Sequence, residues 1–183
     1  MPESDHGITP ELVAELSGGM VTADAPGLDA AIDRAVESVR ALCGWHVWPV
    51  REDRLRLDTT GGRWVKLPTL RLVELSAVIV DGKPLDLDTV EWSDKGMVRL
   101  TRGRFPEGYG RVVVEFRHGF NTPAALGGVV AAIAGRAMLA AGGATLRVGE
   151  VSVGATGGGP GGNLAPLSSE WHLLGRYALE PGV

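Results

Sequence analysis

The fold of this chain changes character at one heptapeptide, Cys43-Gly44-Trp45-His46-Val47-Trp48-Pro49. Before it, apolar residues recur every three or four positions, as on one face of a helix. After it, apolar and charged residues alternate, as in strands buried on one side. Gly44 suits the left-handed conformation that closes a helix, and Pro49 prevents the helix from resuming. The heptapeptide therefore marks a passage from helical to β structure.

Two helices are predicted before the heptapeptide. Thr9 can cap a short helix that has Pro10 at its first position and runs to about Leu16. A second helix begins near Pro26 and ends at the heptapeptide. Its predicted packing stripe consists of Leu28, Ile32, Ala35, Val36, Val39, Leu42 and Cys43.

Residues 50–118 predict a small antiparallel sheet with tight turns. Asp81-Gly82 accepts the positive φ angles of a type I′ hairpin turn, and Pro84 directs the returning strand to a sheet edge. A second hairpin is expected around residues 93–96, and residues 111–117 predict the last strand.

Residues 119–142 return to a helical pattern, with Asn121 or Thr122 as the cap and Pro123 in the first turn. The segment 123–143 is long enough to cross a bilayer core of roughly 30 Å. However, its single charge, Arg136, would cost about 2.5–3.5 kcal/mol at the bilayer centre. Because Ala and Gly dominate the segment, we expect a closely packed buried helix and no membrane partner.

Residues 143–183 predict a glycine-rich arm that ends in a short helix. The alternating stretch 146–153 lies between glycines and cannot bury much surface by itself, so we expect it to become ordered against a partner. Trp171, Leu174 and Ala178 follow at helical spacing. The predicted fold class is α+β: a small helical bundle (1–49 and 119–142), an inserted antiparallel β region (50–118), and an extended C-terminal arm (143–183), all in a single domain over 1–183.

Composition restricts the classes of function. The 183 residues carry a formal net charge of −4, which provides no general field for nucleic acid. The single cysteine excludes an internal disulfide and a cysteine-rich zinc site, and it fits synthesis in a reducing compartment. The acidic start of the chain lacks the basic and apolar pattern of a secretory signal.

No motif predicts an enzyme, a cofactor or a metal site. Cys43 stands at a helix C-terminus, where the helix dipole disfavours a thiolate, so a core cysteine is favoured over a reactive pair with His46. The four histidines are dispersed in sequence. The glycines of 157–162 lack the Lys-Ser/Thr that completes a phosphate loop. Trp45 and Trp48 are expected to anchor the helix to the sheet.

A local basic patch is formed by Arg99, Arg102 and Arg104, close to Phe105 and Tyr109. This patch could contact DNA in a channel or an acidic neighbouring subunit, although a solvated loop is the favoured interpretation.

The order of these features resembles the head-to-tail adaptor (connector) proteins of tailed phages, particularly phages that infect actinobacteria. The resemblance rests on the helix that ends in 40–49, on Lys66-Leu67-Pro68-Thr69-Leu70, on 78–85, on Glu91-Trp92-Ser93, on 112–120, on the small-residue helix, on 148–153 and on the terminal helix. These pieces span most of the chain. The departure from the pattern is the glycine-rich stretch 154–162.

The resemblance implies a structural protein of the virion neck, made in the host cytoplasm. It implies a ring of twelve copies that joins the portal to the stopper or tail-completion protein and continues the DNA channel. The C-terminal arm would clamp the portal, and subunits would stay monomeric until they meet it. The residues expected in this portal-binding arm are Arg147, Val148, Glu150, Val151, Val153, Trp171 and Leu174. The alternatives are another neck or tail-completion protein and, more remotely, a soluble non-viral binding protein.

Overall fold

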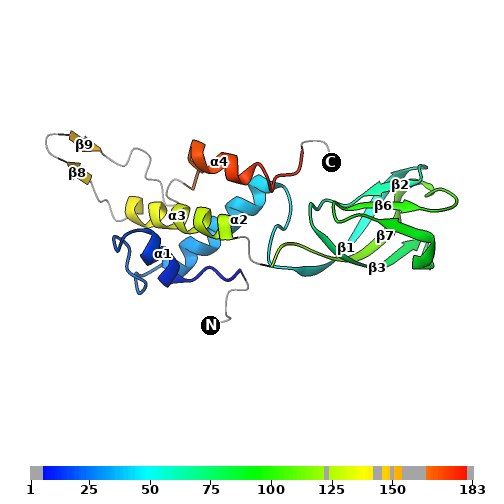
Figure 1. Cartoon of the computed structure of the whole chain (residues 1–183), viewed down its shortest axis with the longest axis horizontal. Coiled ribbons are helices and arrows are strands. Elements are labelled where there is room, and N and C mark those ends of the chain that lie inside the picture. Colours follow the sequence, from blue (N-terminus) through cyan, green and yellow to red (C-terminus); the bar gives the residue numbers. More distant parts are fainter. Residues whose placement is uncertain (1–5, 122–123, 142–145, 149–150, 154–163, 181–183) are drawn as a thin grey trace. The chain divides into compact units, whose positions relative to one another are not determined.

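The computed structural model describes residues 6–121, 124–141, 146–148, 151–153 and 164–180, with the backbone alone for 141, 146–148 and 151–153. The chain belongs to the α+β class, as predicted (Figure 1). It forms two compact units. The helical unit comprises Met1–Leu42 and Thr122–Arg176, and the β unit comprises Cys43–Asn121 and Tyr177–Val183.

The first two helices of the helical unit form where local signals predict them. Helix α1 (Pro10–Leu16) starts at Thr9, whose Oγ1 accepts a hydrogen bond of 3.3 Å from the Leu12 amide. Helix α2 (Leu28–Cys43) buries its predicted apolar stripe, except that Leu42 is 36% exposed and its place in the stripe was wrongly predicted. His6 lies before α1 and contacts α2, because its Nε2 lies 3.1 Å from Asp33 Oδ1.

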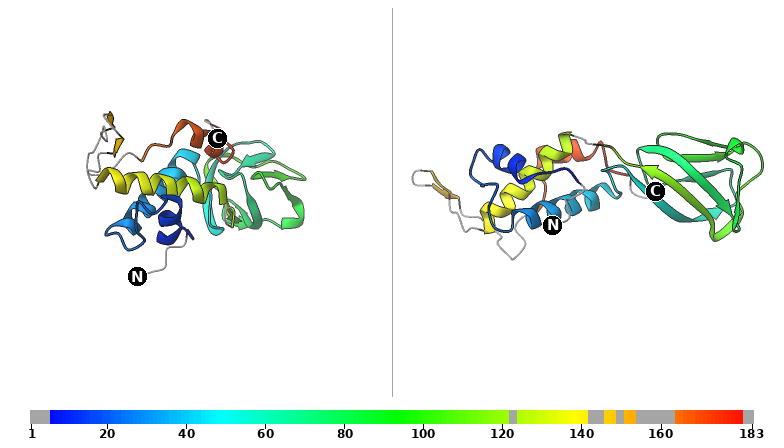
Figure 2. Two further views of the ribbon diagram at one scale, coloured as in Figure 1. Left: turned by 60° about the vertical axis from the view of Figure 1, so that its left-hand side comes forward. Right: turned by 90° about the horizontal axis from the view of Figure 1, so that it is seen from below.

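Helix α3 (Ala124–Ala141) has small residues that allow α1 to approach closely (Figure 2). A methyl group at Gly135 would already contact Val13 at 3.7 Å. Within the described part of the chain, no helix is long and apolar enough to cross a membrane. The single charge of α3, Arg136, forms a two-pronged ion pair with Glu170 of helix α4 (Ser168–Leu174), at 2.7 and 2.9 Å.

The β unit contains two antiparallel sheets (Figure 1). The four-stranded sheet has the order β1 (Arg51–Thr60), β7 (Glu107–His118), β3 (Leu72–Val80) and β4 (Lys83–Pro84). The three-stranded sheet has the order β2 (Trp64–Lys66), β6 (Met97–Leu100) and β5 (Val90–Trp92), with the short 3-10 helix η1 (Leu87–Thr89) before β5.

Turn chemistry fixes both predicted hairpins. Asp81 and Gly82 have φ angles of +49° and +78°, and they connect β3 to β4 as predicted. Pro84 lies on an edge strand, where its missing N–H costs no ladder hydrogen bond. The 93–96 turn connects β5 to β6. Strand β7 starts four residues earlier than predicted, because it continues past a bulge to pair with Thr59 and Thr60.

Alternation of side chains separates the core of the β unit from its surface. On the inner face, Leu55, Val114 and Val78 occupy one cross-strand row. This face and the three-stranded sheet share one apolar core, which includes Val98, Leu100 and the fully buried Phe105. The outer face carries charged rows, including the ion pairs Arg54–Glu115 and Arg117–Glu74.

Candidate interaction sites

The heptapeptide 43–49, called the joint from here on, contains no reactive pair. Cys43 is 1% exposed, and burial raises the pKa of its thiol to about 11. His46 Nε2 lies 2.7 Å from the carbonyl oxygen of Pro49, so its ring is engaged with the backbone. A nucleophilic cysteine needs the opposite shift, toward the thiolate. The prediction of a core cysteine is confirmed.

The joint is instead a packing centre of the β unit. Trp45, Val47 and Trp48 are all buried, at 7%, 0% and 1% exposure. The Trp45 indole N–H donates to the carbonyl oxygen of Tyr177 at 2.6 Å, and the Leu179 amide donates to the carbonyl oxygen of Cys43 at 2.9 Å. The chain therefore returns to the joint after α4, and no pattern in the sequence predicts this contact.

His118 closes this aromatic cluster from β7. Its ring centroid lies 5.9 Å from those of Trp45 and His46 and 4.9 Å from that of Phe116. Burial lowers the pKa of His118 to about 4, and the nearby positive charge of Arg51 adds to this effect, whereas Asp53 opposes it. With a pKa this far below 7, His118 is a neutral, buried ring at neutral pH. Its Nε2 lies 3.5 Å from Asp53 Oδ2, beyond a well-formed hydrogen bond.

The dispersed histidines are thus partly brought together, since His46 and His118 are neighbours in the fold. Two imidazoles do not complete a metal site without further ligands. Among the residues with described side chains, no group of three or more His, Cys, Asp or Glu is placed to hold a metal ion.

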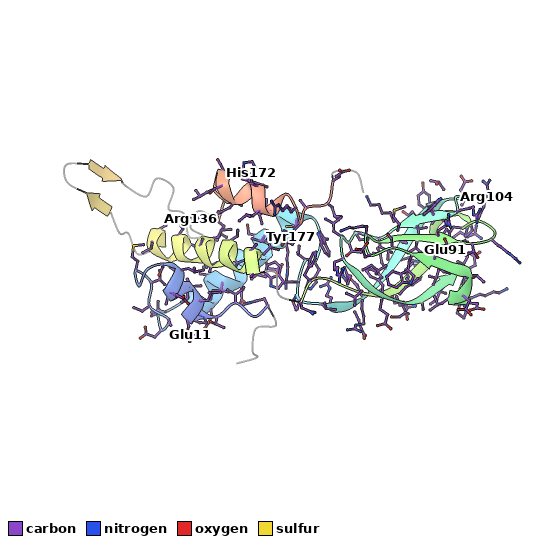
Figure 3. The ribbon with its side chains drawn as sticks, in the orientation of Figure 1. Glu11, Glu91, Arg104, Arg136, His172 and Tyr177 are labelled. Atoms are coloured by element: carbon purple, nitrogen blue, oxygen red, sulfur yellow. The ribbon has the colours of Figure 1, made fainter. Side chains whose placement is uncertain are left out.

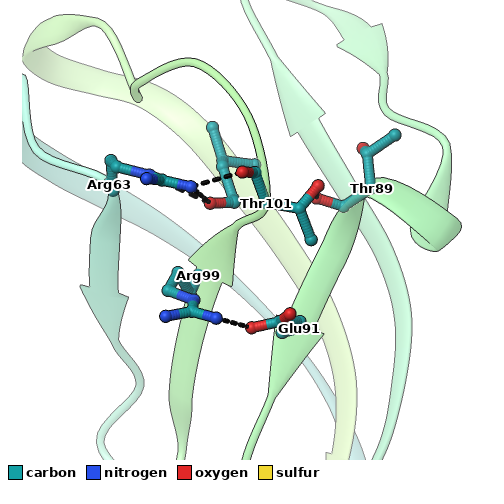
Figure 4. Close-up of polar contacts among 6 residues, drawn as sticks. Arg63, Thr89, Glu91, Arg99 and Thr101 are labelled. Carbon is teal, nitrogen blue, oxygen red and sulfur yellow. Dashed lines mark hydrogen bonds and ion pairs between the residues drawn. The ribbon is translucent and has the colours of Figure 1, made fainter.

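The predicted basic patch divides into two parts. Arg99 lies on β6, opposite Trp64 of β2 and Glu91 of β5 in the sheet register. Its guanidinium stacks 5.0 Å from the Trp64 ring. It also pairs with Glu91 (Figure 4). Arg99 is therefore neutralised on the sheet surface. Arg102 and Arg104 are exposed in the following loop, 101–105, called the arginine loop from here on.

The base of the arginine loop is firmly held. Arg63 donates to the carbonyl oxygens of Leu100, at 3.0 Å, and Thr101 (Figure 4). The Thr101 amide and hydroxyl both donate to the carbonyl oxygen of Thr89, at 2.9 and 3.0 Å. Phe105 is 1% exposed, and its amide donates to Gly62 at 2.8 Å. The sequence places Phe105 beside the patch, and the structure shows it as the core anchor of the loop.

The predicted arm contains a short hairpin. Strand β8 (Leu146–Val148) pairs with β9 (Val151–Val153) in antiparallel register, so that Arg147 is opposite Ser152 and Val148 is opposite Val151. Val153 pairs with Leu146, while Glu150 lies outside the described residues. A two-stranded hairpin by itself is marginally stable in water.

Helix α4 presents only one of its two predicted binding residues. Trp171 is 48% exposed, whereas Leu174 is 1% exposed and belongs to the core of the helical unit. Burial alone would raise the pKa of Glu170, but hydrogen bonds from Arg136 and the Leu167 amide hold that pKa below its usual range. The charged Glu170–Arg136 pair therefore fixes α4 to α3 (Figure 3 shows Arg136).

Comparison with known proteins identifies the fold. No protein-family model matches the sequence, and no curated protein matches it either. A chain in the neck of a native gene transfer agent particle, computed with C12 symmetry, is similar with a TM-score of 0.62 and 16% identity, over 100% of this chain and 95% of that chain. A chain in the neck of an empty particle, computed with C6 symmetry, matches with a TM-score of 0.59 and 17% identity, over 96% and 94% of the two chains.

A third match comes from the virion of a native gene transfer agent particle, with a TM-score of 0.57 and 17% identity, over 93% of this chain and 90% of that chain. The class of fold is therefore one that occurs in gene transfer agent particles. More particularly, two of these three matches are chains of the particle neck, and each spans nearly the whole of both proteins.

Proposed function

We propose that this chain is a structural protein of the neck of a tailed-phage-like particle. In this role it forms a ring of twelve copies, joins the portal to the stopper or tail-completion protein, and continues the DNA channel. The observation that carries the proposal is the fold shared with neck chains, since it extends across both units and nearly the full length of both proteins. The actinobacterial type of phage stays a prediction.

The chemistry of the described residues supports a role without catalysis. The conspicuous Cys43 and His46 are used for packing in the joint, and the thiol has a raised pKa. Ring assembly requires a head-to-tail contact between different surfaces of neighbouring copies, which closes by rotation. One of the similar neck chains comes from a structure computed with C12 symmetry, which supports the proposed copy number for this chain.

The direct test is cryo-electron microscopy of particles that contain the chain, with the neck averaged without imposed symmetry. Twelve copies of this fold in a ring directly beneath the portal are expected. A neck that lacks the chain would refute the proposal. The alternative, another neck or tail-completion protein, has one specific support, the match to a neck computed with C6 symmetry. A ring of six copies placed farther from the portal would favour it.

The role of the arm needs a variant that leaves both units intact. Ending the chain after residue 143 would also remove Glu170, Leu174 and the segment that bonds to the joint. We therefore propose replacing only residues 146–153 with a Gly-Ser linker of equal length. The variant is expected to stay folded and monomeric and to lose docking on portal-bearing capsids. Docking equal to that of the unmodified chain would refute the portal-binding arm, including its residues Arg147, Val148, Glu150, Val151 and Val153.

A further inference from the structure

Most arginines of the β unit are bound within the chain. The ones with a carboxylate or carbonyl partner are Arg51, Arg54, Arg56, Arg63, Arg71, Arg99, Arg111 and Arg117. Arg102 and Arg104 differ from all of these. Among the described residues of the unit, they are the arginines with neither a hydrogen bond nor an ion pair, and both are exposed. Figure 3 labels Arg104 on this loop.

The two free guanidiniums are presented on a rigid base. The backbone on both sides of them is fixed by the contacts of Arg63, Thr101 and Phe105. A preorganised loop loses little conformational freedom when it binds, so its charged side chains are well suited to contact an anion. Trp64, 52% exposed on strand β2 directly after Arg63, offers an aromatic surface beside the loop.

The surroundings of the loop favour carboxylates over a nucleic acid. Thr101 is bonded to Thr89 at the end of η1, which carries Asp88 and is capped by Asp86. Glu107 begins β7, two residues after the loop. Duplex DNA carries one charge per roughly 1.7 Å of helix axis, so a duplex on this loop would also approach these acidic side chains. A discrete pair of carboxylates could contact the loop without approaching these acidic side chains.

Such carboxylates occur on helix α2 of the same protein. Asp29, Asp33 and Glu37 recur every four residues, a rise of roughly 6 Å per step, and therefore form one acidic stripe. Asp33 contacts His6 and Glu37 contacts Arg40, but the two acidic side chains remain 63% and 73% exposed. By sequence, the helical unit has ten acidic and five basic residues, whereas the β unit has twelve acidic and thirteen basic residues.

We propose that the arginine loop of one copy docks on the acidic stripe of α2 in a second copy, with Trp64 at the edge of the contact. This inference rests on the proposed ring and names a contact within it. The two surfaces differ, so each copy can give one and accept the other, which is the head-to-tail geometry that a ring requires. Exposed charge pairs of this kind are individually weak, so the contact is transient between free subunits. In the closed ring every copy makes this contact with both neighbours, and the binding free energies of these contacts add together.

Paramagnetic relaxation in solution can detect such a weak contact. A spin label is attached to A30C, an exposed position on α2, in a chain without isotope label. Cys43 is buried with a raised pKa and stays unlabelled. This chain is mixed with ¹⁵N-labelled wild-type chain at millimolar concentration and low salt. The Gly103 amide and Trp64 indole signals are expected to lose intensity, while signals from the opposite end of the β unit keep theirs.

Charge variants make the test specific. R102E/R104E in the ¹⁵N-labelled chain is expected to restore the intensities and raise the dissociation constant about tenfold. The matched control K83E/K95E, which reverses two exposed lysines of the same unit, should change neither. D29K/E37K is then introduced into the spin-labelled chain. Because the complementary charges have been exchanged, this chain should again broaden the signals of the ¹⁵N-labelled R102E/R104E chain.

Three results would overturn the proposal: no broadening in wild type, broadening that R102E/R104E does not alter, or broadening centred elsewhere on the β unit. The last result would leave the proposed ring intact and reject only this contact. A DNA duplex could bind wild type but not R102E/R104E, while the broadening between copies is the same for both proteins. This result would assign the loop to nucleic acid and also overturn the proposal. Absence of the chain from particle necks would refute the proposed function separately.

Discussion

The joint and the arginine loop differ in the burial of their functional side chains. The joint contains the rare residue types, a cysteine, a histidine and two tryptophans, and the fold buries all of them. The arginine loop contains common residues, and the fold leaves Arg102 and Arg104 exposed on a fixed base. The difference shows that conspicuous residues in this chain serve packing, whereas an inconspicuous Arg-Gly-Arg sequence offers the free charge.

The largest expected effect is the loss of a joint tryptophan. Trp48→Ala removes a side chain that is 1% exposed and should lower the free energy of unfolding by about 3–5 kcal/mol. The matched control is Trp64→Ala, at a tryptophan that is 52% exposed, and it should cost about 1 kcal/mol. Urea denaturation followed by circular dichroism measures both. Equal losses would show that the buried tryptophan of the joint stabilises the fold no more than the exposed Trp64.

Acid should weaken the joint through His118. Its pKa falls from 6.5 in the unfolded chain to about 4 in the fold, so between these values the unfolded chain binds more protons. Stability from the neutral ring is present above pH 6.5 and is lost as the pH falls toward 4. The loss should reach about 3 kcal/mol at most.

The variant His118→Phe keeps an aromatic ring at this position and removes its titration. Urea denaturation at several pH values should show a shallower loss of stability for the variant between pH 6.5 and 4. Parallel pH profiles for the two proteins would show that protonation of His118 does not destabilise the joint.

A smaller loss of unfolding free energy is expected from a substitution at Gly119, which lies against Pro49 of the joint. Gly119 has a φ of +111°, and a side chain there would place Cβ 2.8 Å from the carbonyl oxygen of Pro49. Gly119→Ala should therefore cost about 1–3 kcal/mol in unfolding free energy. Gly128→Ala in α3, where an added methyl meets nothing within 4 Å, should instead stabilise by about 0.5–1 kcal/mol. Thermal unfolding compares the two, and similar melting shifts of the same sign would contradict the expectation.

The smallest expected effect belongs to the arginine loop. Arg102→Gln together with Arg104→Gln should change the free energy of unfolding by about 0.5 kcal/mol or less, because neither guanidinium has a partner among the described residues. Chemical denaturation at neutral pH tests this. A loss comparable to that of Trp48→Ala would mean that the loop has a structural role.

Local signals allowed much of the fold to be predicted. Thr9 and Pro10 define the start of α1, and Asp81-Gly82 defines the β3–β4 hairpin, because caps and turns depend on a few adjacent residues. The exposure of Leu42 was not predictable in this way. It lies at the end of a regular stripe, and only the packing around the last helical turn decides whether that position is covered.

The candidate sites were less predictable, because they depend on partners distant in sequence. Arg99 and Arg102 are close neighbours in the chain, but strand register places Arg99 opposite Glu91 and leaves Arg102 in a loop. Likewise, His118 meets the joint only because of how β7 is placed. The lone charge in α3 was a usable signal, since a charge in an apolar helix generally requires a partner, here Glu170.

The hydrogen bonds of Trp45 and Leu179 have a mechanical consequence for the hairpin β8–β9. The chain continues from the hairpin through α4, which the Arg136–Glu170 pair fastens to α3, and then binds the joint. The two attachments follow the hairpin in chain order, first at α4 and then at residues 177–179. Tension transmitted from the hairpin toward the C-terminus therefore meets the Arg136–Glu170 ion pair first and the hydrogen bonds of Trp45 and Leu179 after it.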